Sequence, residues 1–548
     1  MKWTVEDIRA RFIRPLPAMK QYQDRLDEEF DIITRKGFVT CFMQVTDIID
    51  MIRERGIPHV LRGSGASSLV CYLLGITNID PVKEGMALAR FMNDYRDDQP
   101  DIDIDVPHWV RPQLLEACYE RWPGRVARIS NDVRYRPKTA QRTALKEAGV
   151  KGRIPRGFKI EHYFSDQKKI DAVYARASEL EGEHRHWSLH CGGLIIYPDS
   201  IPQDLVLKDN QIRLTKYDVE EQNLIKIDLL CNRGLSQLWE LDSRPLSDYD
   251  PYDVKTAELL CRGDVLGLTQ AESPTMKKCL TAMQPKSMYD VALALALIRP
   301  AASLGGRKNR YLRGRGGRQI IYDDDSIYYI SERMGCSMGQ ADQYRRAFKS
   351  GKSELMDEFY DRIRGEEDDV SKQLVNLNSY AFCKGHALAY GQMVWALAWH
   401  KARNPERFWR ATLKHVHSSY RPWVHKREAI QAGVFVPHKN WKKSPKDQLL
   451  TNKWWTGEDF FPGMQLFKTP EKGYVGFRGL VAASRRYKRR GMDLHFVTIG
   501  FANGEYVDVV VDHDDWEGNG TVISGCGKLE KRQGSYVIQC KKMWKTWL

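Results

Sequence analysis

The stretch "QPDIDIDVPHW", residues Gln99–Trp109, places three carboxylates at alternate positions with apolar residues between them. This alternation is typical of a β-strand that has one apolar and one polar face. In such a strand Asp101, Asp103 and Asp105 share one face, with neighbouring Cα atoms about 6.5–7 Å apart. Carboxylates this close repel one another unless a cation lies between them. The stretch therefore predicts a strand that packs on a core and binds a pair of divalent ions.

A second apolar stretch, "LIKIDLL" at residues 224–230, contains one isolated carboxylate, Asp228. An unpaired charge among such apolar neighbours costs roughly several kcal/mol, so a partner is expected. Phosphoryl transfer by two metals needs oxygen ligands around ions about 3.5–4 Å apart, and Asp101, Asp103 and Asp228 could supply them. Taken alone, "DIDID" also fits a solvated edge strand or a calcium loop. Asp228 favours the metal centre, and Lys226 shares its face of the strand.

The loop "RGSGASS", residues 62–68, precedes an apolar segment that is expected to be helical. Glycines let backbone N–H groups converge, and the positive end of the following helix would point to the same place, so Gly63 and Ser64 could receive a phosphate. The loop matches neither the P-loop nor the dinucleotide-binding pattern, which disfavours a P-loop ATPase. Its alternative interpretation is a simple turn of the chain.

The 548 residues carry a formal net charge of +14, which favours a polyanionic partner, with nucleic acid before a membrane surface. The run 307–318 has six cations and no acid, and it is expected to be a mobile loop that binds phosphate backbone; the alternative is a simply disordered segment. No apolar run is long enough to span a bilayer and no signal peptide is evident, so a cytoplasmic protein is expected. The eleven scattered cysteines indicate neither disulfides nor zinc.

Composition changes along the chain indicate several parts. Residues 1–60 are predicted to be helical, 130–185 to form an inserted basic helical subdomain, and 235–440 to be dominated by helices. Residues 440–470 have the mixed composition of a linker. Short alternating strands after 475, with an Asn503-Gly504 hairpin signal, predict a small closed barrel.

Four motifs, in order, resemble the palm of the C-family DNA polymerases, the bacterial DNA polymerase III alpha subunits: "RGSGASSLVCYLLGITNIDP", "ARFMNDYRDDQPDIDIDV", "HCGGLIIYP" and "TKYDVEEQNLIKIDLL". Four later motifs resemble the fingers of that family: "GLTQAES", "ALALIRP", "QADQYRRAFKSGK" and "YAFCKGHALAYGQMVWALAWHKARNPERFW". The resemblance implies an α+β multidomain right-hand polymerase with a polymerase-beta-like nucleotidyltransferase palm, helical thumb and fingers, and a C-terminal OB-fold β-barrel. The implied bounds are palm 1–130 and 185–234, thumb 131–184, fingers 235–440, linker 441–474 and OB-fold 475–548.

The same resemblance implies roles for individual residues. Asp101, Asp103 and Asp228 would be the catalytic ligands of two Mg²⁺ ions, with Asp105 as a supporting neighbour. Gly63 and Ser64 would hold the incoming triphosphate. Nucleotide or primer–template contacts are implied for a further set: Arg90, Lys216, Lys226, Arg345, Arg346, Tyr380, Lys384 and His386.

The implied function is a template-directed DNA polymerase whose partners are primer–template DNA and dNTPs. A sliding clamp is a further implied partner, through "GMQLF", which includes Met464–Phe467. The alternatives are a two-metal nuclease, and a catalytically inactive DNA-binding scaffold of replication. By this resemblance we expect a compact form that begins at the palm and lacks the family's PHP domain, and Cys383 stands where the family has asparagine. These departures suggest a bacteriophage-encoded form that acts in the cytoplasm of a bacterial host.

Overall fold

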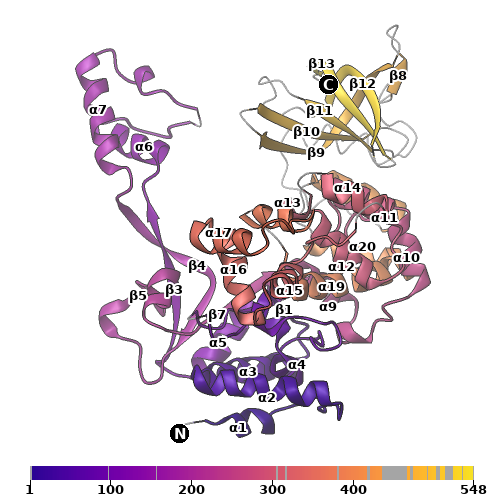
Figure 1. Cartoon of the computed structure of the whole chain (residues 1–548). Coiled ribbons are helices and arrows are strands. Elements are labelled where there is room, and N and C mark those ends of the chain that lie inside the picture. Colours follow the sequence, from indigo (N-terminus) through magenta and orange to yellow (C-terminus); the bar gives the residue numbers. More distant parts are fainter. Residues whose placement is uncertain are drawn as a thin grey trace.

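A computed structural model describes most of the chain and shows two β-sheets connected by helices (Figure 1). The described residues are 3–96, 98–155, 157–303, 306–314, 317–378, 382–415, 420–434, 466–468, 473–489, 492–500, 506–511, 522–532 and 535–546. Among them, no helix is both long enough and apolar enough to cross a lipid bilayer.

The first sheet has seven strands in the order β1-β2-β7-β4-β3-β6-β5. The strands are β1 (Val60–Arg62), β2 (Ile102–Pro107), β3 (Val126–Arg134), β4 (His184–Ile196), β5 (Val206–Lys208), β6 (Gln211–Ile212) and β7 (Lys226–Asn232). Strands β2 and β7 are parallel neighbours, whereas β1 and β4 flank this pair in antiparallel orientation. Both strands expected from the carboxylate motifs are thus confirmed, and the fold makes them adjacent.

Helices cover the apolar face of β2 and β7 (Figure 1). Ile104 and Leu229 are fully buried there, in one core with side chains from the N-terminal helices, so the apolar half of each alternating pattern faces inward. The elements in this part are α1 (Val5–Ala10), α2 (Lys20–Arg35), α3 (Val39–Glu54), η1 (Ser64–Ser67), α4 (Leu69–Leu73), η2 (Leu88–Arg90), α5 (Arg111–Arg121), η4 (Gln203–Leu205) and α8 (Lys216–Glu221). The carboxylates of β2 consequently lie on the opposite face.

Strands β3 and β4 continue beyond the sheet as a long two-stranded ribbon that carries a small helical unit (Figure 1). The unit contains α6 (Pro137–Glu147), η3 (Ile160–His162) and α7 (Gln167–Leu180). Its own apolar cluster includes Leu145, Ile160 and Val173. The helical insertion predicted for this stretch is confirmed.

Residues 233–431 are mainly helical, as predicted, and pack around two further cores, a large one and a smaller one that includes Ile327 and Phe348. The elements are α9 (Arg233–Leu241), η5 (Leu246–Asp248), α10 (Val254–Cys261), α11 (Pro274–Met283), α12 (Met288–Leu297), α13 (Pro300–Ser303), α14 (Arg307–Leu312), α15 (Asp323–Met334), α16 (Met338–Ser350), α17 (Ser353–Arg362), α18 (Ser371–Leu374), η7 (Val375–Asn378), α19 (Lys384–Arg403), α20 (Pro405–His415) and α21 (Pro422–Gln431). At the centre, α19 packs on α12, β1 and η1. Gly391 permits the close approach to α12, because a Cβ there would lie 2.9 Å from Cβ of Ala292.

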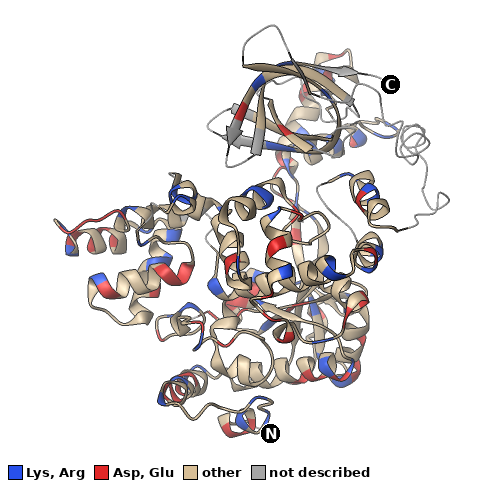
Figure 2. Ribbon diagram, turned by 90° about the vertical axis from the view of Figure 1, so that its right-hand side faces the viewer, with Lys and Arg blue, Asp and Glu red and all other residues tan. Residues whose placement is uncertain are grey.

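The cationic run 307–318 differs from the expected mobile loop. Its first half forms α14, and Arg307 is buried and donates a hydrogen bond to Gln373 over 3.1 Å. Arg318 pairs with Glu332 on α15. The helix and the two cations with partners within the fold contradict the expected mobile loop, whereas binding of phosphate backbone by this run stays a prediction. Lys and Arg positions are also interspersed with Asp and Glu over the helical part and the barrel (Figure 2).

The second sheet is a closed barrel, as predicted. Its strands are β8 (Leu466–Lys468), β9 (Tyr474–Arg489), β10 (Met492–Gly500), β11 (Tyr506–Val511), β12 (Val522–Arg532) and β13 (Ser535–Thr546). The order β9-β10-β11-β13-β12 returns to β9, and β11 runs parallel to β13. The barrel contacts the helical part through a Tyr420–Ala483 bridge and the Lys278–Asp508 ion pair.

Candidate active site

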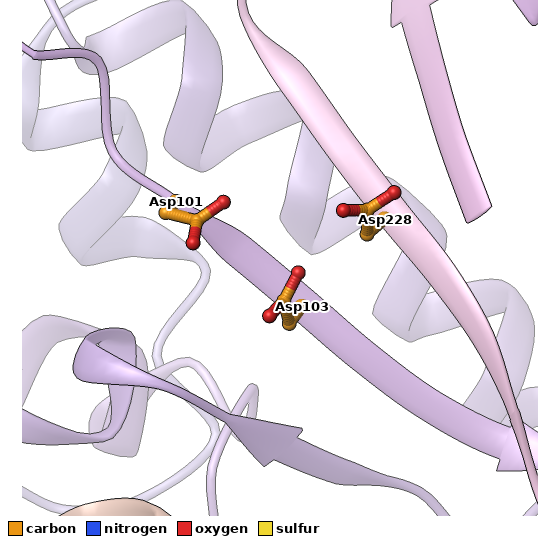
Figure 3. A group of neighbouring side chains, drawn as sticks. All are labelled: Asp101, Asp103 and Asp228. Carbon is orange, nitrogen blue, oxygen red and sulfur yellow. The ribbon is translucent and has the colours of Figure 1, made fainter. Parts of the chain in front are cut away.

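Three of the predicted carboxylates lie together on neighbouring strands of the first sheet (Figure 3). In the parallel pairing of β2 and β7, Asp103 is the direct partner of Asp228. Asp101 immediately precedes β2. One carboxylate oxygen from each residue lies within 4.8 Å of the other two, a spacing at which all three can contact a shared cation.

Strand β4 leaves space for the Asp228 carboxylate because it has glycine at the closest positions. Gly193 is the antiparallel partner of Asp228. A Cβ on Gly192 would lie 2.9 Å from Oδ1 of Asp228 and 2.7 Å from Cδ2 of Leu230. The Gly192–Gly193 pair in "HCGGLII" therefore has a steric role at the carboxylate cluster.

The cluster has one ammonium group and one acceptor without a donor. Lys226 Nζ lies 3.2 Å from Oδ1 of Asp101 and 2.6 Å from Oδ2 of Asp228. The other oxygen of Asp228, Oδ1, is buried and accepts no hydrogen bond from any described residue. His190 Nδ1 lies 3.5 Å from it, but Nδ1 accepts the backbone N–H of Gly193 over 2.8 Å and so has no proton to donate. An orphaned carboxylate oxygen among hard oxygen donors fits a divalent cation of the Mg²⁺ type.

Asp103 is held in an unfavourable environment for its charge. Burial raises its pKa to about 7, and repulsion from Asp101 acts in the same direction. Arg62 partly opposes this effect, with Nε 3.6 Å from Oδ2 of Asp103. A bound cation would relieve both the repulsion and the desolvation.

Asp105 differs from the two preceding aspartates, although the sequence pattern treats all three alike. It is only 3% exposed, and its Oδ2 accepts hydrogen bonds from Tyr390 Oη and Asn232 Nδ2, each over 2.8 Å. Its Oδ1 lies 3.4 Å from Nε of Arg62. One oxygen of this carboxylate thus accepts two hydrogen bonds from protein donors and the other faces Arg62, and Asp105 stands outside the three-residue cation group.

Gly63 and Ser64 lie at the end of β1, beside the cluster. Gly63 has φ 82°, which favours glycine, and a Cβ there would lie 3.8 Å from Oδ2 of Asp103. The expected role of the following helix is wrong, however. The first N–H groups of α4, from Leu69 and Val70, donate to the buried carboxylate of Glu29, so this helix end is already neutralised.

Three predicted cations, Arg90, Arg345 and Arg346, line one pocket of about 690 Å³ beside the chain segment that leads to Asp101. The pocket contains further cations that the sequence analysis did not assign a role: Arg96, Lys349 and Lys352. Burial lowers the pKa of Lys349, and the charges of Arg345 and Arg90 act in the same direction. Such a concentration of positive charge suits a polyanion.

Two buried acids hold the pocket arginines in place. Asp323 lies 2.9 Å from Nη2 of Arg90 and 3.6 Å from Nη1 of Arg345. Asp342 lies 2.7 Å from Nε of Arg345, which is only 3% exposed. The sequence analysis missed both acids, although three consecutive aspartates at 323–325 signal a charged helix start.

The remaining predicted residues are dispersed around the cluster. Lys384 begins α19; its backbone N–H donates to Asp324 over 3.2 Å and its Nζ to the carbonyl of Glu84. His386 packs between the rings of Phe382 and Tyr390, and burial lowers its pKa to about 3, so it is neutral. Lys216 is exposed at the start of α8, where its charge contributes to the lowered pKa of His190. Tyr380 and Met464 lie outside the described residues.

Comparisons with known proteins assign most of the chain. Residues 2–231 match the family described as the bacterial DNA polymerase III alpha NTPase domain, and residues 232–368 match the bacterial DNA polymerase III alpha subunit finger domain. The Error-prone DNA polymerase of Corynebacterium glutamicum is 29% identical over 440 residues, which cover 70% of this chain and 40% of the relative. The protein of the same name from Mycobacterium bovis is 29% identical over 463 residues, or 74% and 42% of the two chains.

The chain spans about two fifths of the length of these curated relatives. The two family matches are consecutive, and both name the same bacterial polymerase subunit. Together they cover residues 2–368, two thirds of the chain. The chain therefore belongs to the C-family DNA polymerases, the family of the bacterial DNA polymerase III alpha subunits.

Proposed function

We propose that the chain is a template-directed DNA polymerase that adds dNTPs to a primer 3′-OH by a two-metal-ion mechanism. The observation that carries this proposal is the pairing of Asp103 with Asp228 on adjacent parallel strands, with Asp101 within reach of both. Relatives named Error-prone DNA polymerase support the same reaction. The bacteriophage origin expected from the sequence stays a prediction.

We assign residues 1–130 and 185–234 to the palm, 131–184 to the thumb, 235–440 to the fingers and 475–548 to an OB-fold. The ribbon-borne unit of α6 and α7 supports the thumb assignment. For the last domain, the support is a five-stranded closed barrel with one parallel contact, between β11 and β13, as suits a Greek-key barrel. The linker 441–474 lies largely outside the described residues, so clamp binding by Met464–Phe467 stays a prediction.

In this mechanism the protein contributes positioning and electrostatics. Asp101, Asp103 and Asp228 would hold two Mg²⁺ ions, which when bound stabilise charge on the attacking and leaving oxygens. Gly63 and Ser64 would present backbone N–H groups to the nucleotide.

The 690 Å³ pocket would bind the triphosphate, because Arg90, Arg346 and Lys349 all line it. Arg345 is too buried to contact a nucleotide freely, and with Asp323 it would orient Arg90. The neutral His386 is suited to a hydrogen bond and not to charge pairing with phosphate.

The test is primer extension with the full chain, primer–template, Mg²⁺ and dNTPs. We expect Asp103→Asn and Asp228→Asn to lose extension by a factor on the order of 10³ or more while DNA binding is retained. Asp24→Asn is the matched control, because Asp24 is exposed on α2 and, among the described residues, forms an ion pair only with Lys20. Shortening of the primer by the wild-type protein would favour a two-metal nuclease, and unchanged extension by both mutants would refute the site.

A further inference from the structure

The buried carboxylate of Asp105 has no role in the proposed cation site, yet it lies at the centre of a polar network. Its Oδ2 is bound by Tyr390 from α19 and by Asn232 from the end of β7. Its Oδ1 faces the guanidinium of Arg62 on β1. Three separate elements thus converge on one side chain of the catalytic strand β2.

Arg62 is shared between two acids and bonded tightly to neither. In the pairing of β1 with β2, Arg62 is the direct partner of Asp103 and Val60 is the partner of Asp105. Arg62 Nε lies 3.6 Å from Oδ2 of Asp103 and 3.4 Å from Oδ1 of Asp105. The Nε atom is buried and makes no hydrogen bond with any described residue, whereas the Arg62 side chain as a whole is 31% exposed and its guanidinium also interacts with Tyr390. Both distances exceed those of a charge-assisted hydrogen bond, about 2.7–2.9 Å, so small shifts decide which acid Arg62 neutralises.

The two acids have unequal freedom. Asp105 is held by two neutral donors, whereas Asp103 belongs to the cation group and must keep its oxygens available. If Arg62 closed onto Asp103, it would occupy an oxygen that a divalent cation needs and would cancel part of its negative charge. The negative charge of Asp105 draws Arg62 in the other direction.

We propose that Asp105 is a positioning residue that keeps Arg62 from pairing fully with Asp103 and so preserves the affinity of the site for divalent cations, with Tyr390 fixing the Asp105 carboxylate. This inference rests on the proposed function, because it takes Asp101, Asp103 and Asp228 as the cation ligands. The hydrogen bond from Tyr390 to Asp105 also connects α19, which carries Lys384 and His386, to the catalytic strand β2. His386 lies four residues before Tyr390, about 6 Å along the helix axis.

The experiment measures binding of Mn²⁺ alone to the full chain, by electron paramagnetic resonance of the free ion. Asp105→Asn keeps the shape of the side chain but removes its charge, which leaves Asp103 as the acid partner of Arg62. We expect Mn²⁺ binding to weaken about tenfold, the scale of one strengthened, partly screened ion pair. Arg62→Gln removes the competing cation, so it should bind Mn²⁺ more tightly than the wild type. The double variant should bind no more weakly than Arg62→Gln.

The double variant separates this role from a merely structural one. If Asp105 acted only through packing or folding, the loss of Mn²⁺ affinity would persist when Arg62 is also replaced. A double variant that binds Mn²⁺ as weakly as Asp105→Asn would therefore overturn the proposal. Wild-type binding by Asp105→Asn would also overturn it. If thermal unfolding measurements show that Asp105→Asn is not folded, Arg62→Gln alone tests the inference. Unchanged or weaker Mn²⁺ binding by Arg62→Gln would then refute it.

A further variant distinguishes failure of this inference from failure of the proposed function. Asp103→Asn should abolish Mn²⁺ binding if the carboxylate cluster is the metal site. If it does and Asp105→Asn has no effect, only the positioning role is wrong. If Asp103→Asn binds Mn²⁺ like the wild type, the metal site itself is wrong.

Discussion

Replacement of Gly192 by alanine tests whether the space beside Asp228 controls catalysis. The new Cβ would lie 2.9 Å from Oδ1 of Asp228, 2.7 Å from Cδ2 of Leu230 and 3.1 Å from the carbonyl oxygen of Leu229. Ordinary contacts of this kind begin near 3.4 Å, so the carboxylate must move by about 0.5 Å. The Leu229 carbonyl belongs to the backbone of β7, so it cannot rotate away as a side chain can, and β7 itself has to shift away from β4.

The expected result is a slower enzyme that still folds. Overpacking of this size costs about 1–3 kcal/mol of unfolding free energy. A misplacement of about 1 Å at a reacting centre can cost about a hundredfold in rate, so a 0.5 Å shift of Asp228 predicts a decrease in kcat of about tenfold. The assay is single-nucleotide incorporation at saturating dNTP, with thermal unfolding measured in parallel.

Gly317→Ala provides the matched control, since a Cβ at that position has no neighbour within 4 Å and Gly317 does not have a positive φ. We expect this variant to retain both the rate and the stability of the wild type. If Gly192→Ala incorporates nucleotides as fast as Gly317→Ala, the carboxylate tolerates displacement and our account of the steric role of Gly192 is refuted.

Three further predictions concern charge. Without metal, Lys226→Met should lose about 1–3 kcal/mol of unfolding free energy, because the neighbouring carboxylates lose their cation. Added Mg²⁺ should therefore raise the Tm of this variant more than that of the wild type. Equal shifts in Tm would contradict this prediction. Asp323→Asn should raise the KM for dNTP several-fold with a smaller change in kcat, since Arg90 loses its partner, and an unchanged KM in steady-state kinetics would argue against the pocket. His400 is buried against Tyr249, and burial lowers its pKa to about 4. Between about pH 6.5 and pH 4 the His400 imidazole therefore binds a proton in the unfolded chain but not in the folded chain. The free energy of unfolding should consequently fall as the pH is lowered from 6.5 to 4. Denaturant unfolding of His400→Gln should show a weaker pH dependence.

Several features could be predicted from local patterns alone. Alternation of acids and apolar residues predicted β2, and the isolated acid in an apolar run predicted that Asp228 has a partner. Both predictions succeeded because side-chain alternation is a property of the strand itself and does not depend on its neighbours. The barrel was predictable for the same reason, since its strands have strong local alternation, whereas the expected Asn503-Gly504 hairpin turn lies outside the described residues.

Predictions that depended on remote partners were less successful. The α4 helix end was expected to receive a phosphate, but Glu29, some forty residues earlier in the chain, neutralises it. The run 307–318 was expected to be a mobile loop, but its first residue, Arg307, is bound by Gln373 in the interior. Nothing in the neighbourhood of either residue indicates these partners, because they are brought close only when helices distant in sequence pack together.

The sequence by itself determined which residues form the acidic strand and to which family the chain belongs. It could not distinguish Asp105 from Asp101 and Asp103, because all three occupy equivalent positions in one alternating pattern. Only the tertiary structure separates them: Asn232 and Tyr390, which are 127 and 285 residues away in the chain, donate to Asp105 and withdraw it from the cation group. The physical reason is that a pattern specifies the face on which a carboxylate lies, whereas its hydrogen-bond donors are supplied by whichever distant elements pack against that face.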